Sequence, residues 1–142
     1  MNDSAEIDRH ALLRLIPHAG SMCLLDRVVA HSEHAIECIA RSHLAPDHPL
    51  RREGQLTALP LVEYAAQAMA AHGALRSGGV QRGMLAALRE IRFFVDRIDT
   101  INAELNIHAT RRIAQTTGSL YDFQVHANGR PLCEGRIAIA FV

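Results

Sequence analysis

The chain has 142 residues, of which fifteen are basic and fifteen acidic, so its formal net charge is zero at pH 7. This length suits a single domain with one hydrophobic core, and we expect residues 1–142 to form it, behind a loose N-terminus at residues 1–7. Balanced charge argues against nucleic acid or anionic lipid as a general partner. We find neither the roughly 18 uninterrupted apolar residues of a membrane span nor a secretory signal, and we expect a cytoplasmic protein.

The composition also narrows the chemistry. All fifteen basic residues are arginine, so Schiff-base chemistry on a lysine is excluded. The three cysteines lie far apart within apolar segments, which favours buried free thiols over a disulfide or a CxxC metal site. The nine histidines form no HxH or HxxxH pair. We therefore expect neither a metal nor another cofactor.

Periodic patterns in the first part of the chain predict one helix and two strands. Residues 7–16 place their apolar side chains on one helical face, and Pro17 ends that helix. Segments 21–31 and 35–43 predict two strands that are joined by a turn. A polar loop over residues 44–55 follows and leads to a second helix.

The longest apolar segment, "PLVEYAAQAMAAHGAL" at residues 60–75, predicts a long helix. Thr57 is a good N-cap and Pro60 is tolerated only in the first turn, so we expect the helix to begin between these two residues. Gly78 and Gly79 supply the break at its end.

Beyond residue 80 the period changes from helical to two. Apolar and polar residues alternate over 101–110 and again over 121–127, as in a sheet with one face in water. The Asn-Gly pair at 128–129 is a strong hairpin signal. With segments 84–98 and 131–142 these make four strands, which we expect to form an antiparallel meander. Because the sheet and the long helix must bury their apolar faces on each other, we predict an α+β fold in which the sheet wraps around the helix.

Glu63 is the unexpected residue of the long helix, and Gln67 lies one turn further on the same stripe. A carboxylate buried without a partner costs several kcal/mol, so Glu63 should be exposed at a cleft, paired or neutral. A structural interpretation is that it stabilises the start of the helix, where the helix dipole favours negative charge by roughly 0.3–1 kcal/mol. The pattern alone leaves the structural and the catalytic interpretation equally open.

Two motifs resemble those of the hotdog-fold 3-hydroxyacyl-ACP dehydratases of bacterial fatty-acid synthesis. These enzymes open with a Pro-His-x-x-x-Met/Phe-Leu-Leu-Val/Leu-Asp-Arg-Val segment and carry a central helix of the type Glu-x-Met-Ala-Gln. In this chain the first motif is matched by "PHAGSMCLLDRV" at 17–28, and the second by Glu63, Ala66 and Gln67. The chain is most similar to the divergent dehydratase-like proteins of aryl-polyene and pigment gene clusters.

The resemblance implies a hotdog fold, no cofactor, and dehydration of 3-hydroxyacyl thioesters carried by an acyl carrier protein, in fatty-acid, polyene or related lipid biosynthesis. It gives Glu63 the role of the acid that protonates the departing 3-hydroxyl, with Gln67 orienting that carboxyl. Backbone groups around Gly54 and at the helix start near Pro60 would bind the thioester oxygen.

The sequence does not clearly identify the residue that acts as the base of this reaction. The family's catalytic histidine follows a glycine in the loop before the helix, whereas here Gln55 follows Gly54. The candidates are His18, in the Pro-His motif, and His48, in the loop before the helix. Competing interpretations are a structural hydrogen bond for His18 and a position on the loop surface for His48. We expect His72 to face solvent near the end of the long helix.

Two other functions stay open, namely a thioesterase in which Glu63 activates water, and a hotdog subunit of little activity that partners a competent dehydratase. The thioester could be carried by acyl carrier protein or by CoA. Hotdog domains pair edge to edge, so we expect a homodimer or a heteromer with another hotdog dehydratase. Because acyl carrier proteins are acidic, we expect Arg51, Arg52 and Arg82, which flank the long helix, to contact the carrier.

Overall fold

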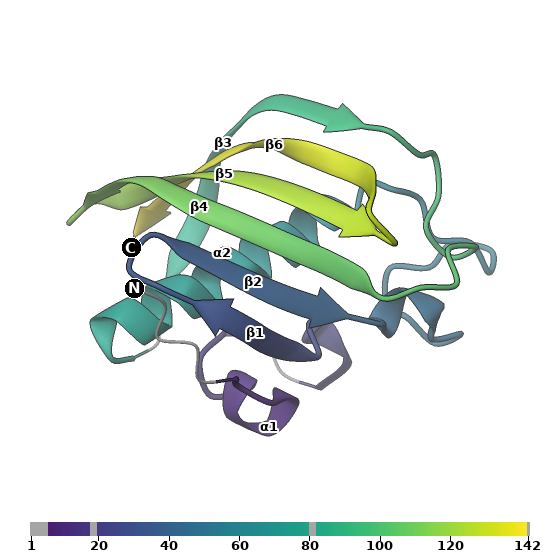
Figure 1. The fold of residues 1–142 in the computed structure, drawn as a ribbon, viewed down its shortest axis with the longest axis horizontal. Helices are drawn as coiled ribbons and strands as arrows, with labels where there is room; N and C mark the ends of the chain where they lie inside the picture. Colours follow the sequence, from purple (N-terminus) through teal and green to yellow (C-terminus); the bar gives the residue numbers. More distant parts are fainter. Residues whose placement is uncertain (1–5, 18–19, 80–81, 142) are drawn as a thin grey trace.

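The fold is described from a computed structural model, which describes residues 6–17, 20–79 and 82–141. The elements follow in chain order: α1 (Arg9–Leu12), the 3-10 turn η1 (Gly20–Met22), β1 (Arg27–His31), β2 (Ala35–Ala40), the 3-10 turn η2 (Ser42–Leu44), α2 (Leu61–Ser77), β3 (Gly83–Phe93), β4 (Leu105–Gln115), β5 (Gly118–Ala127) and β6 (Arg130–Phe141). The strands form one antiparallel sheet in the order β1-β2-β4-β5-β6-β3. Figure 1 shows this sheet curving around α2, which confirms the predicted α+β fold.

Helix α2 is buried on almost every side, which is where a helix that is apolar all round belongs. Its buried residues are Leu61, Val62, Tyr64, Ala65, Gln67, Ala68, Met69, Ala71, His72, Gly73 and Ala74. The helix ends as predicted, with Gly78 in the left-handed conformation at φ 83°. Its start differs slightly, because Pro60 takes the N-cap position and Thr57 instead forms a β-bridge with Arg97.

The predicted meander of the last four strands is wrong in one respect. Strand β3 pairs with β6, not with β4, and only β4, β5 and β6 form consecutive hairpins. The connection from β3 to β4, residues 94–104, is too long for a hairpin and is bonded to the segment before α2. The N–H of Ala58 donates to the carbonyl of Asp96 (3.0 Å), and the N–H of Ile98 donates to that of Leu56 (2.9 Å). This connection therefore carries the chain from the β6 edge to a place beside β2.

Strand β3 forms an open edge of the sheet and is exposed on both faces. Several of its apolar side chains lie in solvent, among them Met84 (60% exposed) and Leu88 (48% exposed). The pairing with β6 is interrupted twice by bulges, and Glu90 in the second has a positive φ of 55°. Such an edge is open to pairing with another chain.

Elements before α2 are shorter than the sequence predicted. The first helix covers only Arg9–Leu12, with Asp8 as its N-cap, and Ile7 makes a bridge to Val28. The first strand begins at Arg27 instead of residue 21, because the segment before it turns, and Met22 and Leu24 bond to Gln67 of α2.

Four of the described histidines are buried, namely His31, His43, His48 and His72, although the sequence placed His48 and His72 at the surface. His72 is 0% exposed, and its Nε2–H donates to the carbonyl of Ser32 (2.9 Å) while its Nδ1 accepts from the Tyr121 hydroxyl (2.6 Å). Burial lowers the pKa of His72 to about 4, and it also lowers the pKa of His43 and of His48. The His72 side of α2 packs against β5 and the turn between β1 and β2, and periodicity misplaced His72 because it cannot show which sides of a nearly all-apolar helix are covered.

We predict that acidification destabilises the protein through His72. Below the unfolded-state pKa of roughly 6.5, His72 binds a proton in the unfolded chain, whereas in the folded chain it binds one only near pH 4. The free energy of unfolding present at neutral pH therefore falls as the pH is lowered, by up to about 1.4 kcal/mol per pH unit. Urea unfolding between about pH 7 and about pH 5 should show a smaller loss of stability for His72→Gln than for the unaltered protein. The exposed His108, changed to Gln, is the control and should keep the original slope. Identical slopes for all three proteins would contradict this role of His72.

Candidate functional site

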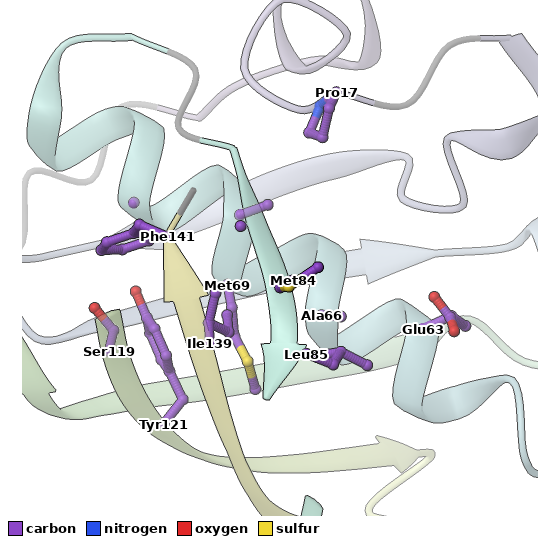
Figure 2. Close-up of a pocket in the computed structure, with 13 residues that line it drawn as sticks. Pro17, Glu63, Ala66, Met69, Met84, Leu85, Ser119, Tyr121, Ile139 and Phe141 are labelled. Carbon is purple, nitrogen blue, oxygen red and sulfur yellow. The ribbon is translucent and has the colours of Figure 1, made fainter. Parts of the chain in front are cut away.

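A groove of about 170 Å³ runs along α2, between this helix and strands β3 and β6 (Figure 2). Its lining is mostly apolar and consists of Pro17, Glu63, Ala66, Met69, Ala70, Gly73, Gly83, Met84, Leu85, Ser119, Tyr121, Ile139 and Phe141. The groove thus brings together the Pro17 end of the first motif and the Glu63 of the second.

The sequence of α2 creates this space. Glu63, Ala66, Ala70 and Gly73 recur at intervals of three or four residues, so they lie along one side of the helix. The last three have small side chains, which leave room between the helix and β3. From Glu63 to Gly73 the helix rises by about 15 Å, and Figure 2 shows Glu63 at the end of the groove opposite Phe141.

Glu63 is an exposed side chain at one end of the groove. Among the described residues, no hydrogen bond or ion pair to its carboxylate is found, so no structural partner accounts for the acid there. Of the alternatives left by the sequence, exposure at a cleft is the one that the structure shows.

Gln67 is buried and uses both ends of its amide on the backbone of a distant segment. Its Nε2 donates to the carbonyl of Met22 (2.6 Å), and its Oε1 accepts from the N–H of Leu24 (2.8 Å). The carbonyl of Leu24 accepts in turn from the hydroxyl of Ser42 (2.7 Å). Gln67 therefore positions the segment that follows Pro17 against α2, and these bonds leave its amide turned to that segment and not to Glu63.

His48 is also buried, and both of its ring nitrogens have partners. Its Nδ1 accepts from the N–H of Leu50 (3.0 Å), so in the neutral ring Nε2 carries the proton and donates to the hydroxyl of Tyr64 (3.1 Å). Tyr64 then donates to Ser42 over 2.6 Å. Since His48 has no free lone pair in this arrangement and does not line the groove, its contacts are those of a structural residue.

The other candidate base, His18, lies outside the described residues. The preceding residue, Pro17, lines the groove together with Glu63. In the described part of the chain, no three His, Cys, Asp or Glu side chains gather into a metal site.

The sequence suggested that the start of α2 offers free N–H groups to a thioester. In the structure these N–H groups are already bonded. The first three N–H groups of the helix donate to carbonyl oxygens three residues earlier, at 2.9, 3.1 and 2.9 Å. Such 3-10 bonds satisfy groups that an open helix end would leave unpaired. Gly54, in the loop before the helix, and Pro60, at its N-cap, do not line the groove.

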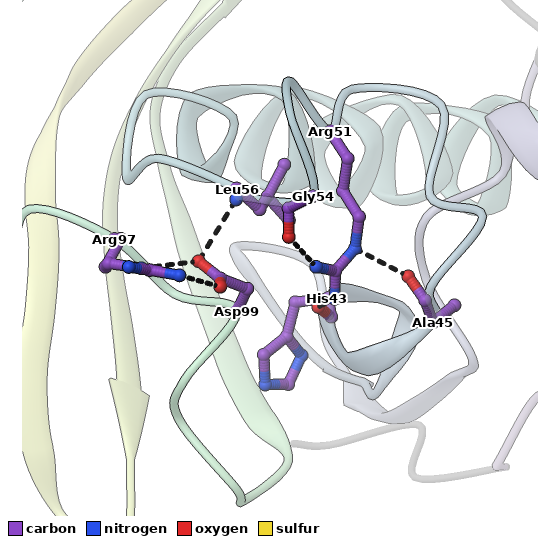
Figure 3. A network of polar contacts seen from close by, with 7 residues as sticks. All are labelled: His43, Ala45, Arg51, Gly54, Leu56, Arg97 and Asp99. Carbon is purple, nitrogen blue, oxygen red and sulfur yellow. Dashed lines mark hydrogen bonds and ion pairs between the residues drawn. The ribbon is translucent and has the colours of Figure 1, made fainter.

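Arg51 holds the loop before α2 through its guanidinium (Figure 3). Its guanidinium donates to the carbonyls of His43 (3.1 Å), Ala45 (2.8 Å) and Gly54 (2.6 Å). Arg52 and Arg82, the two other arginines expected to contact a carrier, are exposed and lie at opposite ends of α2. The structure therefore does not gather the three arginines into one patch.

Hydrogen bonds of Asp99 attach the same loop to the connection between β3 and β4. Asp99 accepts from the N–H of Leu56 (3.0 Å) and from the guanidinium of Arg97 (Figure 3). The hydrogen bond from Arg97 keeps the pKa of Asp99 well below its usual range. Sequence reasoning did not identify Asp99, because nothing in the local pattern predicts a contact with a residue so distant in the chain.

We predict that Gln67→Met lowers stability. The change keeps the volume of the side chain but leaves the buried backbone groups of Met22 and Leu24 without partners, which should cost roughly 1–3 kcal/mol in the free energy of unfolding. Chemical denaturation measures this cost, and Gln124→Met, at an exposed position on β5, is the matched control. If both variants stay within about 0.5 kcal/mol of the unaltered protein, the positioning role of Gln67 is wrong.

None of the helices formed by the described residues is long and apolar enough to span a membrane. No curated protein matches the sequence. Among solved structures, the chain is similar to the dehydratase heterocomplex ApeI:P from Xenorhabdus doucetiae, with a TM-score of 0.84, 21% identity, and coverage of 92% of this chain and 90% of that chain.

More distant similarity extends to other proteins with the same fold. AziG from S. sahachiroi gives a TM-score of 0.64 at 14% identity, over 91% of this chain and 98% of that chain. A hypothetical thioesterase from Streptococcus pneumoniae TIGR4, solved with coenzyme A, gives 0.59 at 13% identity, over 81% and 84%. At these identities the similarity concerns the fold alone.

The family comparison reaches further than the fold. The family described as ApeP-like, ApeP dehydratase, matches residues 10–141, which is nearly the whole chain. This match confirms the resemblance to dehydratases that the two motifs indicated. The chain belongs to the ApeP-like family of dehydratases.

Proposed function

We propose that this dehydratase binds the acyl chain of a 3-hydroxyacyl thioester in the groove along α2 and protonates the departing 3-hydroxyl from Glu63. The observation that carries this proposal is an exposed carboxylate without a structural partner among the described residues, at one end of an apolar groove. In the reaction a base removes the proton at C2, the bond between C3 and oxygen breaks, and the hydroxyl leaves as water with a proton from Glu63. The product is the 2,3-unsaturated thioester.

For the base we propose His18. Its support is the position of Pro17, which lines the same groove as Glu63, and the hydrogen bonds of Gln67 that fix the segment after it. His48 is a weaker candidate because its two ring nitrogens already bond to Leu50 and Tyr64.

We further propose that the active form is a heteromer with a second hotdog dehydratase, paired along the open edge of β3. Both faces of β3 are exposed, and Met84 and Leu85 form one wall of the groove while also lying in solvent. A partner strand on this edge would bury these apolar groups and exclude water from the groove. Similarity of this chain to the dehydratase heterocomplex ApeI:P supports a hotdog partner.

We propose acyl carrier protein, not CoA, as the carrier of the thioester. Arg52 and Arg82 are exposed arginines that could steer an acidic carrier, whereas Arg51 is held by three backbone carbonyls. Turnover of the same acyl group on the two carriers, at low and at moderate salt, tests this choice. Equal kcat/KM for both carriers, or no effect of Arg52→Glu and Arg82→Glu on the carrier-bound substrate, would contradict it.

A subunit of little activity, which serves mainly to complete its partner, remains the second candidate. The observation that favours it is the engagement of His48, which leaves the loop before α2 without a free histidine base among the described residues. The same turnover assay, run on this chain alone and in complex with a second hotdog dehydratase subunit, separates the two candidates.

We predict that Glu63→Gln lowers the turnover of a 3-hydroxyacyl-ACP by about 100-fold or more, because the amide cannot donate the proton. Stability should change by less than about 0.5 kcal/mol, since the side chain is exposed. Products are measured by mass, for the chain alone and with its hotdog partner. Full turnover of Glu63→Gln in both settings would show that the acid is not catalytic.

Two histidine variants serve as controls in the same assay. His18→Ala should reduce turnover without a comparable loss of stability. His48→Gln should instead lower the melting temperature more than the turnover per folded molecule, because it breaks the chain of hydrogen bonds from Leu50 to Ser42.

We predict that Leu88→Arg weakens assembly with the hotdog partner by about tenfold or more, because it places a charge in the centre of the edge that would be buried. Sedimentation of the mixed subunits measures the change. Ile113→Arg is the matched control, since Ile113 is similarly exposed (46%) but lies on β4, away from the β3 edge. Equal effects of the two substitutions would mean that β3 is not the interface.

A further inference from the structure

Side chains hold the segment 20–25 against the rest of the fold, and no described strand pairs with it. Gln67 of α2 bonds to the backbone of Met22 and Leu24, and the hydroxyl of Ser42 donates to the carbonyl of Leu24. These bonds fix the middle of the segment. They do not reach its first residue, which is the end nearer in sequence to the wall of the groove.

Arg9, the first residue of α1, bonds to both ends of this segment. Its Nη2 donates to the carbonyl of Gly20 (3.0 Å), and its Nη1 donates to the carbonyl of Leu25 (2.8 Å). The other bond found at the Gly20 carbonyl among the described residues comes from the N–H of Cys23 (3.1 Å), inside the same turn. Within the described part of the chain, Arg9 is therefore the residue that attaches the start of the segment to the rest of the protein.

The backbone that carries Arg9 is itself fixed to the sheet. Ile7, two residues earlier, exchanges two backbone bonds with Val28 of β1, at 2.9 and 2.8 Å. Asp8 is the N-cap of α1 and accepts from the N–H of Ala11 (2.9 Å). Because a guanidinium presents its donors in a rigid planar fork, it can hold two carbonyl groups at once from this fixed base, whereas the ammonium of lysine is a single point charge on a flexible chain.

The attachment buries little apolar surface. Arg9 is half-buried, Gly20 is exposed, and Met22 in the same turn is 44% exposed. Surface bonds of this kind contribute little to stability. The residues that precede Gly20 in the chain include Pro17, which lines the groove, and His18, which we propose as the base. The bonds of Arg9 are thus better placed to serve the site than to serve the core.

We propose that Arg9 is a positioning residue for the dehydration, which keeps the segment that carries His18 in the place where this base can remove the C2 proton. This inference rests on the proposed function and on the role of His18 in it. The rate of such a step depends steeply on geometry, because a misplacement of about 1 Å can lower it by about 100-fold.

Arg9→Met tests this role, with Arg9→Lys as the conservative variant. In the assembly with the hotdog partner, Arg9→Met should lower kcat per folded molecule for a 3-hydroxyacyl-ACP by about tenfold or more, while KM stays within about twofold. Because removal of the C2 proton then limits turnover, the isotope effect on kcat for substrate deuterated at C2 should be clearly above one and at least as large as in the unaltered protein. Arg9→Lys should restore part of the lost kcat, since it retains a donor.

Hydrogen exchange followed by mass spectrometry measures the attachment itself, without turnover. The amides of residues 22–25 should exchange about tenfold faster in Arg9→Met, and the melting temperature should fall by no more than about 4 °C. Arg14→Met is the matched control, because Arg14 is an exposed arginine shortly after α1 whose side chain makes no hydrogen bond or ion pair with the described residues. This variant should keep the original kcat, isotope effect and exchange rates.

Three results would overturn the role of Arg9, namely unchanged hydrogen exchange in Arg9→Met, an unchanged kcat per folded molecule, or a lowered kcat with an isotope effect near one. Failure of the proposed function gives a different result. No turnover by the unaltered protein, alone or with its hotdog partner, would reject the proposed reaction, and hydrogen exchange would still decide whether Arg9 holds the segment.

Discussion

Enclosure of α2 by one curved sheet is the constraint on which the rest of the structure depends. The polar side chains that this enclosure buries cannot reach water, so each of them requires a partner from elsewhere in the chain. Tyr64 binds His48, Gln67 binds the backbone at Met22 and Leu24, and His72 binds Ser32 and Tyr121. These bonds attach the loop before the helix, the segment after Pro17 and the turn between β1 and β2 to the same helix. Satisfying the buried polar groups of α2 thus also places the loops around the groove.

The groove is the side of α2 that the sheet does not close. Small residues on this stripe and the position of β3 at the edge, beyond β6, leave a space along the helix. Glu63 belongs to this stripe, which explains how an acid persists in a largely buried helix without a partner among the residues that the structure describes. Under the proposed function the apolar wall matters for chemistry, because an acyl chain bound there would displace water from around the carboxylate and strengthen its interaction with the reacting groups.

This chain belongs to the ApeP-like dehydratases, but its loop before α2 is modified. Arg51 and Asp99 hold this loop through backbone contacts, and His48 contributes a hydrogen bond to the core. The loop is therefore rigidly attached, although the histidine expected to follow its glycine is replaced by Gln55. This loop does not supply the catalytic base of the family. The groups that we propose in its place are those of the Pro17 segment and of a partner subunit at the open edge of β3.

The sequence by itself determined the long helix with its glycine end, the strands of alternating burial, the dehydratase family and Glu63 as the residue to test. These features depend on local periodicity and on contiguous motifs, and both can be recognised in the sequence alone. Only the tertiary structure decided that β3 crosses to β6, that His48 and His72 are buried, and that Arg51 binds backbone carbonyls. Each of these depends on contacts made after the sheet has closed around α2. Periodicity shows which face of an element is apolar, but it does not show which distant polar group that face will meet.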